Sequence, residues 1–144
     1  MTQLDLATAR TILSASLTKA GELGLKPLTV AVLDAGGALL ALERQDGSSR
    51  MRPEIAIGKA YGAVQLGMGS RAIFARAEQQ PFFVQSMNAL AGGSLVPVPG
   101  GVLIRNGEGG AILGAVGITG DTSDNDEAAA VAGIEAAGLT ADHG

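Results

Sequence analysis

The sequence contains no cysteine and no tryptophan, and its single histidine, His143, is the penultimate residue. The lack of cysteine excludes disulfides, thiolate metal ligands, iron–sulfur clusters and a cysteine nucleophile. Chain ends are commonly frayed, so His143 is a poor candidate for a ligand or a catalytic base. We expect no metal site, and we expect the residues from Thr140 to Gly144 to be loose.

Positive charge and long apolar runs are also scarce. Ten basic residues face 14 acidic ones, a net charge of -4, and only 3% of the residues are aromatic. Nucleic-acid-binding proteins need basic stripes and stacking aromatics, so we expect no nucleic-acid partner. No apolar run reaches the roughly 18 residues of a membrane span, and the N-terminus lacks the features of a signal peptide. We expect a cytoplasmic protein without a membrane partner.

The chain has 144 residues, of which 47% are apolar, and it contains 22 glycines. This length is typical of one domain with one core, and we expect a single domain spanning residues 1–144. Since aromatics are few, the core must consist of Ala, Val, Leu and Ile. Such a core brings backbones close together.

Hydrophobic periodicity and turn residues predict helices alternating with two strand hairpins. A first helix from about Leu4 to Glu22 has Thr2 and Asp5 placed like a capping box, and Asp124 with Glu127 does the same for the last helix. The other expected elements are a hairpin of 27–33 and 38–42, helices over 53–66, 70–77 and 81–90, and a hairpin of 102–104 and 111–119. Because hairpin strands pair antiparallel, the fold class is α+β with helices packed on an antiparallel sheet.

Five stretches in this order resemble the GlcG/HbpS-like family of haem-degrading proteins, also found as the C-terminal module of PduO-type proteins. They are LTVAVLDAGG (28–37), AIGKAYGA (56–63), PGGVLI (99–104), GAVGITG (114–120) and DEAAAVAG (126–133). The resemblance covers about residues 4 to 138. It implies a profilin-like, five-stranded antiparallel sheet with helices on its faces, and self-association into a dimer or a higher homo-oligomer.

The resemblance also implies a small-molecule ligand. Members are described as haem-binding or haem-degrading, some bind cobalamin, and others belong to glycolate or diol catabolic operons. This chain departs from the family pattern at Asn125, where glutamine is usual, and it offers no internal histidine as a haem ligand. Haem is the one cofactor that we consider. Because no internal histidine is available, haem would be weakly ligated, bound through tyrosine, methionine or water, or held mainly by its propionates.

Lys59 is the first candidate site residue, because it lies mid-helix between Gly58 and Gly62. A glycine inside a helix costs about 1 kcal/mol relative to alanine, so something, a ligand or another segment, must approach closely there. The amine could bind a carboxylate, or act as a base or Schiff-base amine if burial lowers its pKa. A plain surface or interface lysine is the alternative.

The candidate ligand-binding residues are Arg52, Lys59, Pro99, Gly100, Gly101 and Asp126. The segment Pro97–Gly101 either presents backbone N–H groups to an anionic ligand or is a rigid approach to a strand. Asp126, which the family motif contains, could pair with Lys59 or act as a general base. Arg52, with Arg44 and Arg50, is suited to a propionate or carboxylate, although such arginines are more often solvated.

Three functions remain open. The leading hypothesis is a homo-oligomeric small-molecule binding protein, with haem or another tetrapyrrole as the candidate ligand. The second is a cofactor-independent enzyme acting on a small carboxylate or carbonyl metabolite, with Lys59 and Asp126 as its catalytic pair. The third is a purely structural, oligomer-forming accessory module without a pocket.

Overall fold

The computed structural model describes residues 1–144 and contains five helices and five strands. Its elements, in chain order, are α1 (Leu6–Leu23), β1 (Thr29–Asp34), β2 (Leu39–Arg44), α2 (Arg52–Leu66), α3 (Ser70–Gln79), α4 (Pro81–Leu90), β3 (Gly101–Arg105), β4 (Ile112–Thr119), α5 (Ser123–Ala136) and β5 (Thr140–Asp142). Every expected helix and both expected hairpins are present. The predicted α+β class with a five-stranded antiparallel sheet is confirmed.

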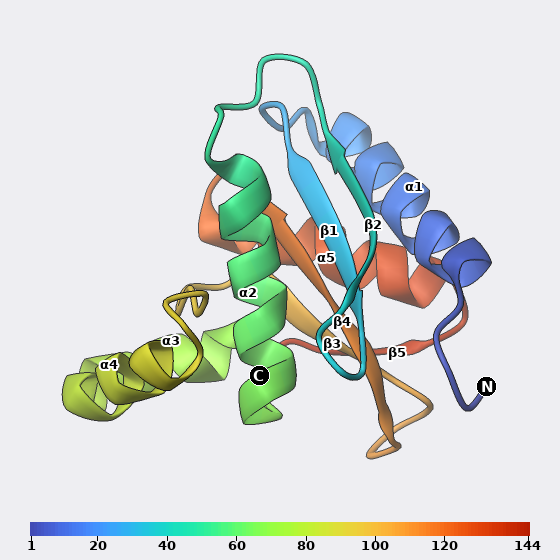
Figure 1. The fold of residues 1–144 in the computed structure, drawn as a ribbon. Helices are drawn as coiled ribbons and strands as arrows, with labels where there is room; N and C mark the ends of the chain where they lie inside the picture. Colours follow the sequence, from blue (N-terminus) through green and yellow to red (C-terminus); the bar gives the residue numbers. More distant parts are fainter.

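The strands form one sheet in the order β2-β1-β4-β3-β5, with antiparallel pairing throughout. The two hairpins join through β1 and β4, which pair over their full length from Thr29 opposite Thr119 to Asp34 opposite Gly114. Helices α1 and α5 cover one face of the sheet, and α2 covers the other (Figure 1). The α3–α4 pair projects to one side (Figure 1).

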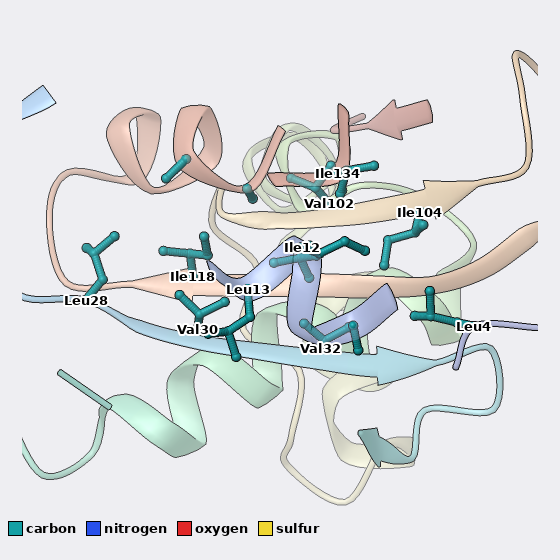
Figure 2. Close-up of a cluster of buried hydrophobic side chains, with 14 of the residues drawn as sticks. Leu4, Ile12, Leu13, Leu28, Val30, Val32, Val102, Ile104, Ile118 and Ile134 are labelled. Carbon is teal, nitrogen blue, oxygen red and sulfur yellow. The ribbon is translucent and has the colours of Figure 1, made fainter. Parts of the chain in front are cut away.

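The larger part of the core lies between the sheet and the α1–α5 layer (Figure 2). Alternate strand residues such as Val30, Val32 and Ile118 point into it and meet Ile12 of α1 and Ile134 of α5, all fully buried. The opposite face carries a smaller cluster, in which Leu33, Leu103 and Ala115 pack on alanines of α2. This side-chain alternation is what a sheet covered on both faces requires.

Three local expectations about the chain ends and caps were wrong. Asp5, not Thr2, caps α1, because its carboxylate accepts a hydrogen bond from the Thr8 N–H at 2.8 Å. The α5 cap is Thr122, whose hydroxyl accepts from the Asn125 N–H at 3.2 Å. Of the residues expected to be loose, Thr140–Asp142 form β5, which pairs with β3. Short polar clusters contain several possible caps, and a three-residue strand has no periodicity to detect.

The α2 helix packs directly on the sheet because small residues remove the side chains between the two backbones. A Cβ atom on Gly117 of β4 would lie 1.8 Å from the Ala56 carbonyl oxygen of α2. A Cβ on Gly101 of β3 would lie 2.3 Å from the Lys59 carbonyl oxygen. Since real Cβ atoms essentially never come so close, glycine is required at both positions. This close packing of α2 brings Lys59 to the C-terminal end of β4.

None of the helices combines the length and the apolar character that crossing a bilayer requires.

Candidate functional site

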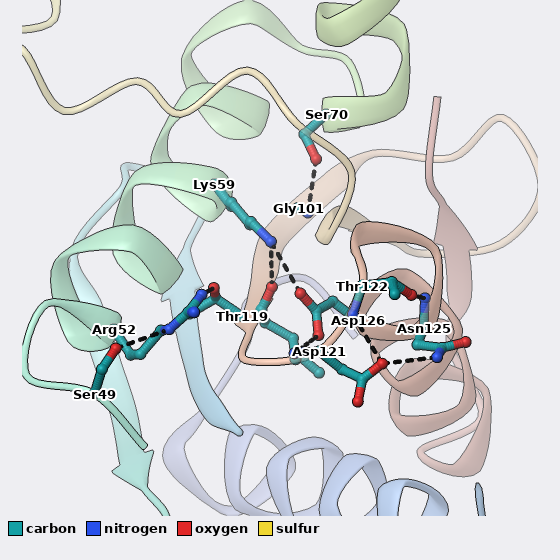
Figure 3. Close-up of polar contacts among 11 residues, drawn as sticks. Ser49, Arg52, Lys59, Ser70, Gly101, Thr119, Asp121, Thr122, Asn125 and Asp126 are labelled. Atoms are coloured by element: carbon teal, nitrogen blue, oxygen red, sulfur yellow. Dashed lines mark hydrogen bonds and ion pairs between the residues drawn. The ribbon is translucent and has the colours of Figure 1, made fainter. Parts of the chain in front are cut away.

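Lys59, in the middle of α2, and Asp126, in the first turn of α5, come together at the end of β4 (Figure 3). The Lys59 Nζ donates to the Ile118 carbonyl oxygen at 2.8 Å and to Asp126 Oδ2 at 3.3 Å. The other carboxylate oxygen of Asp126 accepts from the Asp121 backbone N–H at 2.9 Å. Two helices on opposite faces of the sheet are thus connected by one ion pair.

This ion pair is almost fully removed from solvent, with side-chain exposures of 3% for Lys59 and 2% for Asp126. Burial lowers the pKa of Lys59 from its usual value, against the opposing effect of the Asp126 charge. Burial likewise raises the pKa of Asp126, against the opposing effect of Lys59. Desolvation disfavours both charged forms, so each group is held closer to neutrality than it would be in water.

Gly100 closes this pair off from one side. Its φ of 121° is a conformation that L side chains rarely adopt, and a Cβ there would lie 2.8 Å from the Lys59 Nζ and 2.6 Å from the Ile118 oxygen. Its own carbonyl accepts from the Ile118 N–H at 2.9 Å, and the Gly101 N–H donates to the Ser70 hydroxyl at 2.7 Å. These backbone groups of the predicted ligand loop are therefore engaged within the protein, and Pro99 beside them is buried.

The space beside the two glycines of α2 is also occupied by other residues of this chain. A Cβ on Gly58 would meet the Val96 side chain at 2.6 Å and the Ser94 carbonyl at 2.9 Å. On Gly62 it would meet Leu95 at 3.0 Å. The expected close approach is real, and the segment before β3 makes it.

Arg52, at the start of α2, is the one predicted ligand-binding residue that is only partly buried. Its Nε donates to the Ser49 hydroxyl at 3.0 Å and its Nη1 to the Thr119 hydroxyl at 2.6 Å (Figure 3). Its Nη2 has no hydrogen-bond partner within the protein. The side chain is therefore held in one orientation and keeps free donors, as recognition of a carboxylate requires.

Asp121 is a member of this site that the sequence did not single out for a role. Its carboxylate accepts from the Lys26 N–H at 2.9 Å and from the Asn125 side chain at 2.8 Å. These bonds, with the Lys26 N–H first, lower the pKa of Asp121 from 3.8 to about 2. Only its position after the Gly120 turn, at a helix start, could have indicated a backbone-binding carboxylate.

The neighbouring acids Asp124 and Glu127 do not face Lys59. Both pair with Arg71 of α3, the Glu127 contact being 2.9 Å, and both raise the pKa of that arginine. The acidic cluster is thus divided between two cations: Asp126 pairs with Lys59, and Asp124 and Glu127 pair with Arg71. The turn of the helix points these side chains in different directions.

The ion pair has no direct path to solvent in this conformation. Gly100 lies against the Lys59 amine, and the two side chains of the pair are at most 3% exposed. As it stands, the pair can bind a backbone carbonyl and join α2 to α5. Proton transfer to an outside molecule would require the Gly100 segment to move away.

The five-stranded antiparallel sheet with helices on both faces places the chain among small α+β domains. The chain belongs to the HbpS-like family: the model described as "Haem degrading protein HbpS-like" matches residues 4–135. This confirms the resemblance stated from the sequence.

Individual relatives match along nearly their whole length. A 15.0 kDa protein from the dhaT-dhaS intergenic region of Citrobacter freundii is 31% identical over 124 residues, covering 85% of this chain and 84% of the relative. A double mutant of HbpS from Streptomyces reticuli superposes with a TM-score of 0.80 at 26% identity, covering 94% and 87% of the two chains. A PduOC:haem complex gives a TM-score of 0.82 at 22% identity, covering 95% and 96%.

Proposed function

We propose that this protein binds haem or a closely related tetrapyrrole and works as a homo-oligomer. The observation that supports the proposal is membership, over residues 4–135, of a family described by haem degradation. PduOC, which shares the fold, has been crystallised with haem. The two chains align over 95% of this chain and 96% of that one, so the proposal concerns this domain as a whole.

The arginines of this chain suit the edge of such a ligand that carries its carboxylates. Arg52 has a free Nη2 donor, and Arg50 next to it is exposed. Two guanidinium groups at one helix start match a pair of carboxylates such as the haem propionates. Met51, between them, is 67% exposed and offers a thioether, one of the side chains that can coordinate haem iron.

Self-association forms part of the proposal because a single chain offers no enclosed, apolar site of adequate size. The cavity that is lined mostly by apolar residues measures about 190 Å³, whereas pockets for drug-sized ligands are roughly 300 Å³ or more. Enclosing a planar macrocycle therefore requires more surface than one chain supplies.

Retention of haem through a desalting column tests this proposal. After incubation with excess haemin, we expect the wild type to keep haem at a whole-number ratio to chains or chain pairs. Arg52→Gln removes the donors to a carboxylate and should weaken binding about tenfold, whereas Arg10→Gln, an exposed arginine on α1, should not. A wild type that retains no haem would refute the proposal, and equal retention by both variants would refute the role of Arg52.

The second candidate is a cofactor-independent enzyme that uses Lys59 and Asp126 on a small carboxylate or carbonyl metabolite. It is supported by the lowered pKa of Lys59 and the raised pKa of Asp126, because displaced pKa values cluster at functional sites. Its test is borohydride reduction in the presence of a small aldehyde. A secondary amine at Lys59 in preference to the exposed Lys19 would support it, and labelling of Lys19 alone would contradict it.

A further inference from the structure

The α4 helix is apolar but largely uncovered. Only Val84 of its ten residues is buried, while Phe82 and Leu90 are both 81% exposed. Among the helices and strands, α4 packs chiefly on α3 (Figure 1). An exposed group of large apolar side chains on one helix marks an interaction surface.

The exposed residues form one continuous face. Phe82, Gln85, Ser86, Ala89 and Leu90 are all exposed and follow the i, i+3, i+4, i+7, i+8 spacing of a helical stripe. We refer to them as the α4 face. The Ser86 hydroxyl already donates to the Phe82 carbonyl at 2.9 Å, so covering it leaves no unsatisfied donor. Gln85 is the one polar side chain that would need a partner.

The segment that contains α4 has no charged residue of its own, and one charged side chain from α3, Arg76, stacks on the Phe83 ring at 4.2 Å. From Gln79 to Ile104 the sequence contains no Asp, Glu, Lys, Arg or His. Interface cores are depleted of charged residues, and each copy of this chain has a net charge of -4, so most faces repel a second copy. None of the five residues of the α4 face is charged, so two copies of the face can meet without opposing like charges.

We propose that the α4 face is the contact between two copies of this chain, with the two α4 helices antiparallel across a two-fold axis at Ser86. A two-fold interface brings the same surface together from both subunits. Phe82 and Leu90 lie four residues on either side of Ser86, about 6 Å along the axis. Antiparallel pairing therefore places Phe82 of the partner subunit against Leu90.

A receiving cavity lies beside Leu90. Leu90, Met87, Leu66 and Tyr61 are among the residues around a cavity of about 190 Å³ with a mainly apolar lining. A cavity of about 150 Å³ is sufficient for a benzene ring, so Phe82 of the partner subunit fits. Each Phe82 is 81% exposed, so at about 200 Å² for an aromatic side chain the two residues alone supply about a fifth of a standard interface.

This inference specifies the surface for the self-association in the proposed function, and acidic substitutions test it. Phe82→Glu places a carboxylate in the first turn of α4, where the helix dipole favours it, so α4 should stay folded. Leu6→Glu is the matched control, since Leu6 is a 43% exposed residue in the first turn of α1, on the other side of the molecule.

Sedimentation equilibrium distinguishes the outcomes. We expect a dimer or larger assembly for the wild type and Leu6→Glu, and a lower mass for Phe82→Glu with unchanged circular dichroism. An associated wild type whose mass Phe82→Glu does not lower would overturn the α4 face and leave the proposed self-association intact. A monomeric wild type would overturn both. Loss of haemin binding in Phe82→Glu at unchanged mass would assign the face to the ligand and overturn the proposal.

A cysteine introduced at the axis tests the geometry independently of any loss of folding. Helices that pack 8–10 Å apart bring facing Cα atoms to within about 6 Å, a distance that a disulfide can span. Ser86→Cys should form a covalent dimer under mild oxidation, and the exposed Ser14→Cys on α1 should not. Equal rates of crosslinking for the two variants would contradict a two-fold axis at Ser86.

Discussion

The Lys59 amine is held by two oxygens, the Asp126 carboxylate and the Ile118 carbonyl, in a place that water does not reach. Neither an exposed salt bridge nor an open catalytic dyad has this combination. A buried pair contributes little net stability compared with an apolar replacement, but breaking it is costly because the remaining charge has no partner.

Lys59→Met should therefore lower the free energy of unfolding by about 3 kcal/mol or more, since it leaves Asp126 buried without its cation. Lys19→Met is the matched control, because Lys19 pairs with Glu22 at 3.8 Å on the surface, and the change there should be below about 0.5 kcal/mol. Urea denaturation followed by circular dichroism measures both. Equal effects would contradict a buried pair.

Sequence reasoning identified Lys59 and Asp126 as partners through the family motifs and their possible charge pairing. It did not identify the covering of the pair, which depends on Gly100 adopting a φ of 121° against the Ile118 backbone. Nor did it identify Asp121, because a carboxylate that binds the Lys26 backbone across 95 residues leaves no local pattern. These are properties of tertiary packing.

At the scale of elements, α1 and α5 pack so closely that Gly133 of α5 has no room for a side chain. A Cβ on Gly133 of α5 would lie 2.0 Å from the Ser16 hydroxyl and 2.5 Å from the Ile12 carbonyl of α1. The Ser16 hydroxyl is buried and has no hydrogen-bond partner, a costly arrangement for a polar group.

Gly133→Ala should destabilise the protein by roughly 1–3 kcal/mol, because the helices must separate to admit the methyl group. Gly21→Ala in α1 is the control: no atom lies within 4 Å of its added Cβ, and the gain in helix propensity should be stabilising. Ser16→Ala removes the unpartnered hydroxyl and should leave stability unchanged or raise it by about 1 kcal/mol. Thermal unfolding ranks the three variants, and a stabilising Gly133→Ala would contradict this packing.

The turn that leads into α5 should make stability depend on pH. Asp121 has a pKa of about 2 in the folded protein, below its usual 3.8, so the unfolded chain binds the extra proton between these values. Its contribution is present above about pH 4 and lost as the pH falls towards 2.

Asp121→Asn should therefore lose less stability than the wild type between pH 5 and pH 2. The pKa of Asp5 is also lowered, but Asp5 is present in both proteins and its effect is the same in each. Melting temperatures across this range provide the comparison. Parallel curves for the two proteins would show that Asp121 is not stabilised as an anion.

Hydrophobic periodicity was sufficient to predict the helices and hairpins, because α1, α2 and the β1 and β4 strands have clear repeats and turn residues. It was insufficient for β5, whose three residues pair only because β3 leaves an edge beside them. It also could not show that α4 would expose Phe82 and Leu90, because a helical repeat does not state which face is covered.

For the whole molecule, the family match, the acidic net charge and the uncharged α4 face support one account. We propose that the domain binds a ligand with a carboxylate edge at Arg52 and associates with a second copy through the α4 face. The Lys59–Asp126 pair joins α2 to α5. Arg52 is the first residue of α2, and this connection keeps its side chain oriented towards Thr119.

A haemin titration of the purified wild-type protein, followed at the Soret band, tests this account most directly. We predict a saturable shift with a defined stoichiometry, unchanged in Tyr61→Phe and weakened in Arg52→Gln. No shift beyond that caused by an unrelated acidic protein would contradict the account and leave the cofactor-independent enzyme and the structural accessory module as the remaining candidates.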